Sequence, residues 1–206
     1  MARRKSDRAW LQAHERDAYV RGARASGYRS RAAFKLLEID ERARLLRPGM
    51  TVVDLGASPG GWSQVAAERV GSKGRVVALD ILPMAPLEGV TFVRGDFHEQ
   101  AVLETLLETL SPHAPELVMS DMAPNMSGIK AVDQPRIIEL AELALDLCGH
   151  VLAPGGHLVV KVFQGQGYQA YLDALRCRFA RVQVHKPQAS RSQSAEQYLL
   201  AHQYGV

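Results

Sequence analysis

The stretch Asp54-Leu-Gly-Ala-Ser-Pro-Gly-Gly-Trp62 decides the fold of this 206-residue chain. It begins at the end of the apolar run Thr51–Leu55 and leads into a helical pattern over residues 61–70. Glycines at a strand-to-helix turn let the backbone approach a ligand closely and adopt positive φ. Because ligands of open α/β sheets bind beyond the carboxyl ends of the strands, the stretch predicts a ligand-binding turn.

On either side of this turn, short apolar runs alternate with helical patterns. The runs predict strands at Thr51–Leu55, Arg75–Asp80, Val90–Arg94, Glu116–Ser120 and His157–Phe163. The periodic segments predict helices at about 30–46, 61–70, 98–110, 134–152 and 167–178. Continuous apolar runs are typical of strands buried on both faces. Strand–helix alternation therefore predicts an α/β fold with a doubly wound, mostly parallel, Rossmann-like sheet and right-handed crossovers.

The C-terminal part has a different pattern. Residues alternate between apolar and polar over Phe179–His185 and again over Gln197–Gln203, with the polar linker Gln188–Ala195 between them. Alternation is typical of strands with one solvated face. The sequence therefore predicts a final hairpin, in which at least one C-terminal strand is antiparallel.

The basic charge of the chain lies in its first residues. Residues 1–31 hold nine basic and three acidic side chains, a balance of 9 − 3 = +6, whereas the whole chain carries +3. This segment also contains Trp10, Tyr19 and Tyr28, so it is suited to neutralising phosphates and stacking on bases. A solvated tail is the alternative. We expect an RNA-binding arm over residues 1–30, mobile to about residue 25, and one domain over residues 31–206.

Composition excludes several classes of protein. No apolar run approaches the roughly 20 residues that cross a bilayer, and no apolar stretch follows the N-terminal Met-Ala-Arg-Arg-Lys as in a secretory signal. Cys148 and Cys177 stand outside any CxxC or metal-ligand spacing. We therefore expect a cytoplasmic monomer with reduced thiols, no metal site and no contact with membranes.

The glycine-rich turn also restricts the ligand. It matches neither GxxxxGK[ST] nor GxGxxG, and Pro59 removes an amide that a pyrophosphate would use. Asp80 closes the second strand, where an acid can bind the ribose hydroxyls of an adenosine, and Asp96 follows the third strand, within reach of the adenine. With Asp54, these carboxylates suit a cationic adenosyl ligand with an amino-acid tail. That ligand is S-adenosylmethionine.

A second set of polar residues surrounds the same predicted edge. Lys161 lies inside the apolar strand Leu158–Phe163, where a lysine is costly unless it is paired or lies at the rim of the sheet. Asp121 ends the preceding strand, so the two side chains are expected to meet. Glu196 precedes the last strand, and Lys35 lies on the helix before the sheet.

Five motifs in order resemble the FtsJ/RrmJ (RlmE) family of ribosomal RNA ribose 2′-O-methyltransferases. They are Ser30-Arg-Ala-Ala-Phe-Lys35-Leu, Asp54-Leu-Gly-Ala-Ser-Pro-Gly-Gly-Trp62-Ser-Gln64, Asp121-Met-Ala-Pro-Asn125, Lys161-Val-Phe163 and Ser190-Arg-Ser-Gln-Ser-Ala-Glu196. The resemblance covers nearly the whole chain. It implies a catalytic Lys-Asp-Lys-Glu tetrad at Lys35, Asp121, Lys161 and Glu196. It implies cofactor-binding positions at Gly60, Trp62, Asp80, Asp96 and Asp121. The implied substrate is a uridine in the A loop of large-subunit ribosomal RNA, within the assembled subunit.

The chemistry assigns a hypothetical role to each of the four catalytic candidates. Transfer to a ribose hydroxyl needs in-line placement and removal of its proton. Lys161 is the base or the group that orients the hydroxyl, and Asp121 and Glu196 hold its amine. Lys35 supplies positive potential and positions the substrate.

Other functions remain open at this point. A ribose methyltransferase of transfer RNA, of a messenger cap or of another structured RNA would share the tetrad. A non-catalytic RNA-binding assembly factor would keep the fold without its chemistry. A nicotinamide-dependent oxidoreductase is disfavoured by Pro59 and by the missing GxGxxG pattern.

Overall fold

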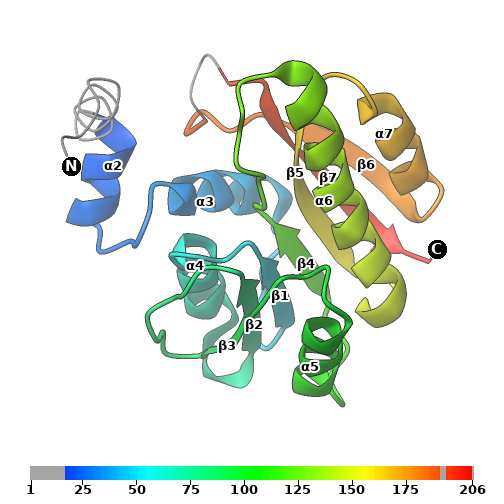
Figure 1. Ribbon diagram of the computed structural model, residues 1–206. Coiled ribbons are helices and arrows are strands. Elements are labelled where there is room, and N and C mark those ends of the chain that lie inside the picture. The colour runs from blue at the N-terminus through cyan, green and yellow to red at the C-terminus, as the bar shows by residue number, and fades with distance from the viewer. Residues whose placement is uncertain (1–16, 191–193, 206) are drawn as a thin grey trace.

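The computed structural model describes residues 17–190 and 194–205, which form one mixed sheet with helices on both faces (Figure 1). The strands are β1 (Thr51–Leu55), β2 (Arg75–Asp80), β3 (Val90–Arg94), β4 (Leu117–Ser120), β5 (His157–Phe163), β6 (Phe179–His185) and β7 (Glu196–Tyr204). The helices are α2 (Ala18–Ala25), α3 (Ala32–Ala43), α4 (Gly61–Val70), α5 (Gln100–Leu110), α6 (Lys130–Val151) and α7 (Tyr168–Arg176), with a short 3₁₀ helix at Gly71–Lys73.

The seven strands have the order β3-β2-β1-β4-β5-β7-β6. Pairing is parallel from β3 to β5, and β7 is antiparallel to both of its neighbours, β5 and β6. The predicted doubly wound sheet and the predicted C-terminal hairpin are therefore confirmed. Because β1 lies between β2 and β4, the glycine-rich turn after β1 opens at the centre of the sheet.

Two apolar clusters hold the helices against the sheet. Helices α5, α6 and α7 cover one face, where Leu106 and Leu145 pack on the buried strands. Helices α3 and α4 cover the other face, where Leu36 and Val65 are fully buried (Figure 1). Burying one such side chain contributes about 1.5–3 kcal/mol, so each amphipathic helix is held mainly by its contact with the sheet. Within the described ranges, none of the helices is both long and apolar enough to span a membrane.

Helix α6 differs from its predicted bounds. It begins at Lys130, four residues before the predicted start, and Pro135 lies inside its second turn. The Asp133 carboxylate accepts hydrogen bonds from the backbone N–H groups of Ser127 (2.8 Å) and Gly128 (2.9 Å) and from the Ser127 hydroxyl (2.8 Å). These bonds fix the chain ahead of the proline, so that the helix can start earlier. Pro135 has no N–H, so α6 lacks the one backbone hydrogen bond that this position would otherwise donate, and the loss lies near the start of the helix.

The basic N-terminal segment also differs from expectation, in the part that the structure describes. Residues 18–25 form α2, in which Val20 and Ala23 are buried. Tyr19 packs on Phe34 of α3 with ring centroids 5.8 Å apart, and Arg31 pairs with Asp17. The expectation of a mobile segment is therefore wrong for residues 17–25, because these apolar and ionic contacts hold α2. Residues 1–16 lie outside the described residues.

The turn at residues 27–29 is anchored to the rest of the domain by two side chains. Gln64 of α4 accepts from the backbone N–H of Arg29 (3.2 Å) and donates to the carbonyl of Gly27 (3.0 Å). The Arg29 guanidinium donates to the carbonyls of Ala85 (2.7 Å) and Pro86 (2.6 Å). The end of the predicted RNA-binding arm is therefore attached to the loop that follows β2.

Both cysteines are free thiols, as expected. Cys148 is buried within α6, and Cys177 is exposed directly after α7. Burial raises the pKa of the Cys148 thiol to about 12. This thiol is therefore unreactive at neutral pH.

Gly56 allows the turn after β1 to approach the turn after β4. Its φ is +74°, and a Cβ added there would lie 2.8 Å from Cγ of Met122 and 2.9 Å from the Met122 backbone nitrogen. The pairing of Leu55 with Ser120 brings these two segments together. A residue without a side chain is therefore required where the two strand ends meet.

We predict that Gly56→Ala destabilises the protein more than Gly155→Ala does. Both glycines have a similar positive φ, +74° and +78°, but a Cβ at residue 155 meets no atom within 4 Å. Alanine at residue 155 then costs about 1–2 kcal/mol of backbone strain. At residue 56 the clash with Met122 adds about 1–3 kcal/mol. Urea unfolding of both variants measures the difference, and equal losses of free energy of unfolding would contradict it.

Candidate active site

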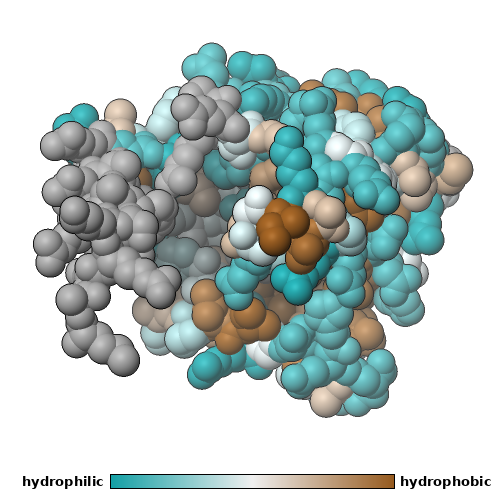
Figure 2. Space-filling view, turned by 45° about the horizontal axis from the view of Figure 1, so that its top comes forward, coloured by the Kyte–Doolittle hydropathy of each residue, from teal (hydrophilic) through white to brown (hydrophobic). Residues whose placement is uncertain are grey.

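The carboxyl ends of the parallel strands open into a cavity of about 710 Å³. The turn after β1 contributes Gly56 and Ser58, and the segment after β4 contributes Asp121 to Asn125. Helix α6 closes one side with Arg136 and Glu139. In Figure 2, apolar residues interrupt a mostly hydrophilic surface beside a hollow. The cavity lies at the sheet edge where the sequence predicts a ligand.

Two of the predicted cofactor-binding carboxylates line this cavity at the ends of β2 and β3. Asp80 is nearly buried and accepts backbone hydrogen bonds from Ser58 and Leu82, each at 2.8 Å. Asp96 accepts from the backbone N–H of His98 (3.0 Å), and its Oδ1 lies 2.7 Å from the His98 ring. These hydrogen bonds from His98, backbone first, lower the pKa of Asp96. Both carboxylates are therefore held in place by local hydrogen bonds.

Gly60 and Trp62 are not among the residues that line the cavity, although Gly60 belongs to the same turn as Gly56 and Ser58. Gly60 caps α4 with φ +107°, where an added Cβ would lie 3.0 Å from the sulfur of Met84 and 3.1 Å from Arg29. Trp62 is buried, donates from its indole nitrogen to the carbonyl of Ala32 (2.8 Å) and packs on Tyr198 with ring centroids 5.5 Å apart. The Trp62 side chain therefore joins α4 to α3 and to the sheet.

A third carboxyl group, Asp54 at the end of β1, is completely buried. Its Oδ2 accepts from the hydroxyl of Ser63 at 2.6 Å, whereas its Oδ1 has no hydrogen-bond partner among the described residues. Burial first, and then the charges of Asp121 and Asp80, outweigh the hydrogen bonds from Ser63 and raise the pKa of Asp54 to about 7. Acids crowded in this way favour the binding of a cation. This donor set fits the positively charged cofactor that the sequence predicts.

Lys161 and Asp121 meet as predicted. Strands β4 and β5 are parallel neighbours, and the Lys161 ammonium lies 3.0 Å from Oδ1 of Asp121. Lys161 also donates to the backbone carbonyl of Asp121. Side-chain exposure is 8% for Lys161 and 18% for Asp121, so the pair is shielded from water but lies next to the cavity. A nearly buried lysine is stabilised here by two acceptors on one residue.

Lys35 and Glu196 form the second ion pair of the site. Their charged atoms are 2.7 Å apart, with side-chain exposures of 11% and 12%. Glu196 begins β7, which pairs with β5 so that Glu196 lies opposite Phe163. The hypothesis that Glu196 holds the amine of Lys161 differs from this arrangement, because Lys35 from α3 occupies the Glu196 carboxylate. The four predicted catalytic residues come together, but as two pairs.

The residue that sequence analysis missed is Tyr198. Its hydroxyl donates to Oδ1 of Asp121 at 2.7 Å and accepts from Lys35 at 3.1 Å. It therefore connects the two ion pairs. Strand periodicity carried the signal, because residues two apart share a face of a strand and Tyr198 follows Glu196 by two.

Between residues 17 and 205, apart from 191–193, no three His, Cys, Asp or Glu side chains are grouped so that they could hold a metal ion.

We predict that Asp54→Asn removes a pH dependence of stability. The pKa of Asp54 is about 7 when folded, above the ordinary 3.8, so the folded state keeps a proton that the unfolded state loses. The contribution of Asp54 to the free energy of unfolding therefore falls as pH rises from about 4 to 7, by about 4 kcal/mol at most, and is constant above. Urea unfolding from pH 4.5 to 8 should show this slope in the wild type and a flatter one in the variant. Parallel slopes would contradict the role of Asp54.

Comparisons with known proteins agree with this geometry. The family model for FtsJ-like methyltransferases matches residues 28–204. A relative from Alkalilimnicola ehrlichii is 57% identical over 204 residues, which cover 99% of this chain and 98% of the relative. One from Azoarcus sp. is 59% identical over 200 residues, covering 97% and 98%. Both relatives are named ribosomal RNA large subunit methyltransferase E.

Solved structures share the fold. A Plasmodium falciparum protein described as a ribosomal RNA methyltransferase superposes with a TM-score of 0.77 at 29% identity, covering 86% of this chain and 98% of that one. A Clostridium thermocellum protein with a TM-score of 0.55 and 18% identity covers 82% and 96%, and supports the fold alone. The family model spans the cavity, both ion pairs and the sheet that positions them, and the chain therefore belongs to the FtsJ-like methyltransferase family.

Proposed function

We propose that this protein transfers a methyl group from S-adenosylmethionine to the ribose 2′-hydroxyl of a uridine in large-subunit ribosomal RNA. We further propose that it acts in the cytoplasm on the assembled subunit. The observation that carries the proposal is the pair Lys161–Asp121 beside an acid-lined cavity, joined through Tyr198 to the pair Lys35–Glu196. The names of the relatives support the choice of ribosomal RNA.

Carboxylates in the cavity would hold the cofactor. S-adenosylmethionine supplies an electrophilic methyl group on a sulfonium. Asp80 would bind the ribose hydroxyls of its adenosine, and Asp96 would bind the adenine. Asp121 lines the same cavity and would add negative charge beside the cofactor, and Asp54 behind it would add to this potential when ionised. Gly60 would contribute through its backbone only, because Arg29 and Met84 cover the position of a side chain.

Lys161 would act on the hydroxyl that is methylated. An ammonium group has three N–H donors, and two of those on Lys161 are used by the carboxylate and carbonyl of Asp121. The third position would face the ribose hydroxyl, and the ammonium would first lose that third proton to solvent, which leaves a neutral amine with a free lone pair. Asp121 would keep the two remaining N–H groups of Lys161 oriented while the lone pair takes the hydroxyl proton, the amine becomes the ammonium again and the ribose oxygen receives the methyl group. Lys35, held by Glu196 and Tyr198, would supply positive potential to the nearby RNA backbone.

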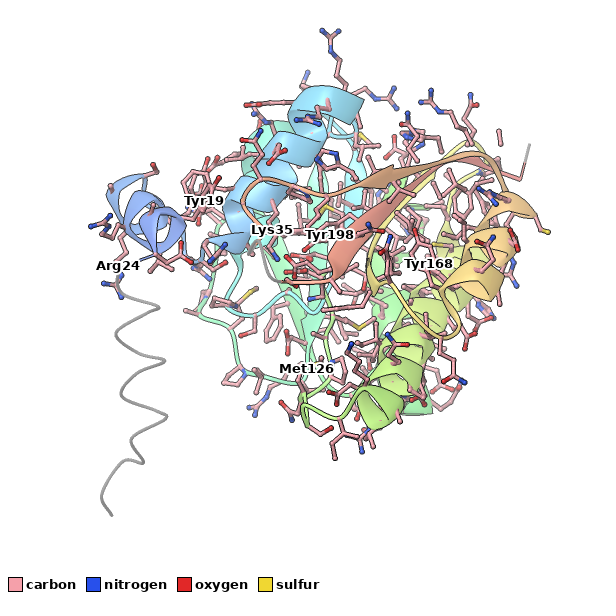
Figure 3. The ribbon with its side chains drawn as sticks, turned by 90° about the horizontal axis from the view of Figure 1, so that it is seen from above. Tyr19, Arg24, Lys35, Met126, Tyr168 and Tyr198 are labelled. Carbon is pink, nitrogen blue, oxygen red and sulfur yellow. The ribbon has the colours of Figure 1, made fainter. Side chains whose placement is uncertain are left out.

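The RNA would approach over the carboxyl edge of the sheet. Figure 3 looks down on this edge, with Lys35 and Tyr198 near the centre and with Tyr19 and Arg24 of α2 to one side. Arg24 lies in the last turn of α2, and residues 1–31 carry all of the basic excess of the chain. Positive charge on this side would neutralise phosphates of the RNA. The division into an arm over 1–30 and a domain over 31–206, and the monomeric state, remain predictions.

We predict that Lys161→Ala lowers methyl transfer by about 10²–10⁴-fold, the usual effect of removing a group that moves a proton. Lys73→Ala, in the 3₁₀ helix after α4, serves as the matched control and should retain full activity. Binding of S-adenosylhomocysteine should raise the melting temperature of wild type and both variants, whereas NAD should not. Near-normal turnover by Lys161→Ala would contradict its role.

The test of the proposed function is transfer of a tritiated methyl group to large ribosomal subunits that lack their own modification. We expect label at one ribose of the large-subunit RNA, mapped as a 2′-O-methyl group. Free ribosomal RNA and transfer RNA are assayed in parallel. Labelling of transfer RNA alone would keep the chemistry and reassign the substrate. The absence of label on every RNA, with S-adenosylhomocysteine still bound, would favour a non-catalytic assembly factor.

A further inference from the structure

Tyr198 lies at the junction of the two ion pairs. Its hydroxyl is 2.7 Å from Oδ1 of Asp121 and 3.1 Å from the ammonium nitrogen of Lys35. That Oδ1 atom is also the one that lies 3.0 Å from Lys161. One carboxylate oxygen is therefore shared between the tyrosine and the lysine that would act on the substrate.

The position of the hydroxyl is fixed by the fold. Tyr198 is completely buried and lies directly opposite Lys161 in the antiparallel pairing of β5 with β7. Trp62 packs against its ring, and the Lys35 ammonium lies 5.6 Å from the ring centroid. The ring cannot turn away without opening the core between α3, α4 and the sheet. Figure 3 shows Lys35 and Tyr198 side by side.

The hydrogen bonds of Tyr198 have only one possible direction. A lysine ammonium can only donate, and an ionised carboxylate can only accept. The tyrosine hydroxyl must therefore accept from Lys35 and donate to Asp121. This arrangement supports the ionised form of Asp121 and the protonated form of Lys35 together.

We propose that Tyr198 is a positioning residue for methyl transfer, whose hydroxyl holds Asp121 and Lys35 in the geometry and charge state in which Asp121 orients Lys161. This inference rests on the proposed function. It adds Tyr198, which would touch no substrate and would act through Asp121 and Lys35.

The electrostatics of Asp121 agree with this role. Burial alone would raise the pKa of Asp121, but the charges of Lys161 and Lys35 and the hydrogen bond from Tyr198 outweigh it, and the pKa is lowered. Removing the tyrosine hydroxyl removes one of these stabilising contacts. The carboxylate would then attract the ammonium proton of Lys161 more strongly. The ionisable groups that surround the Asp121 carboxylate come from four elements. They are Lys35 (α3), Asp54 (β1), Lys161 (β5), and Glu196 and Tyr198 (β7).

The test is Tyr198→Phe, assayed by single-turnover methyl transfer to large ribosomal subunits between pH 6 and 10. We expect the rate to fall by about tenfold, the effect of one lost hydrogen bond to a charged group. We also expect the rising limb of the pH–rate profile to move upward by about half a pH unit. The dissociation constant of S-adenosylhomocysteine and the KM for subunits should stay within about twofold, because the hydroxyl touches neither.

Tyr171→Phe is the matched control. Tyr171 is also a buried tyrosine, and its hydroxyl donates to the carbonyl of Ala141 at 2.8 Å, in the helical layer on the other face of the sheet. This variant loses a buried hydrogen bond without touching the ion pairs. We expect a reduced melting temperature with an unchanged pH–rate profile. A shift of the profile in Tyr198→Phe alone would therefore separate positioning from a general loss of stability.

A second variant keeps the test decisive if Tyr198→Phe does not fold. 3-Fluorotyrosine placed at residue 198 keeps the ring and the hydroxyl but makes the hydroxyl a stronger donor. The rising limb should then move to lower pH, opposite to the effect expected for phenylalanine.

The outcomes separate the two proposals. If wild-type protein labels the subunits but Tyr198→Phe retains its rate and profile, Tyr198 is only a structural residue and the inference is overturned. An equal loss of rate in both tyrosine variants, with no shift in either profile, also overturns it. If wild-type protein labels no RNA at any pH, the proposed function fails, and the role of Tyr198 fails with it.

Discussion

Negative charge gathered at one edge of the sheet is the constraint on which the site depends. Parallel pairing of β2, β1 and β4 brings Asp54, Asp80 and Asp121 beside one another at their carboxyl ends. The electrostatic repulsion between these three carboxyl groups is relieved differently at each position. Asp54 has a raised pKa, Asp80 accepts two backbone hydrogen bonds, and Asp121 pairs with Lys161. A cationic ligand in the cavity would relieve it further, because the acids that line or adjoin the cavity exceed the positive charge beside them.

Two lysines reach this edge from different parts of the chain. Lys161 comes from the central strand β5, and Lys35 from α3 on one face of the sheet. Leaving either lysine buried without a partner would cost several kcal/mol. Glu196 is therefore needed beside Lys35 as much as Asp121 is needed beside Lys161. Strand β7 supplies both Glu196 and the tyrosine that connects the pairs. The antiparallel strand that sets this sheet apart from a wholly parallel one thus completes the candidate active site.

The loops around the cavity and the basic N-terminal segment are attached to each other. Gln64 of α4 holds the turn at residues 27–29, and Arg29 reaches across to the loop after β2. A side chain at Gly60 is disfavoured by its φ of +107° and by the close approach of Arg29 and Met84. The root of the segment that would contact RNA is therefore built into the loops around the cavity, so RNA and cofactor would bind at the same edge of the protein.

The sequence by itself determined the architecture and most of the site. Apolar runs and helical periodicity are local signals, so the bounds of β1, β2, β3, β5 and β6, and the C-terminal hairpin, could be predicted from them. The meeting of Asp121 with Lys161 followed from adjacent parallel strands. Only the tertiary structure decided how the four charged residues pair, that Tyr198 connects them, that the Trp62 side chain packs in the core, and that residues 18–25 form a docked helix. These outcomes depend on contacts between residues that lie far apart in the chain, such as Lys35 with Glu196. Strand periodicity places Glu196 and Tyr198 on one face of β7, but no local pattern says which residues of other elements they meet.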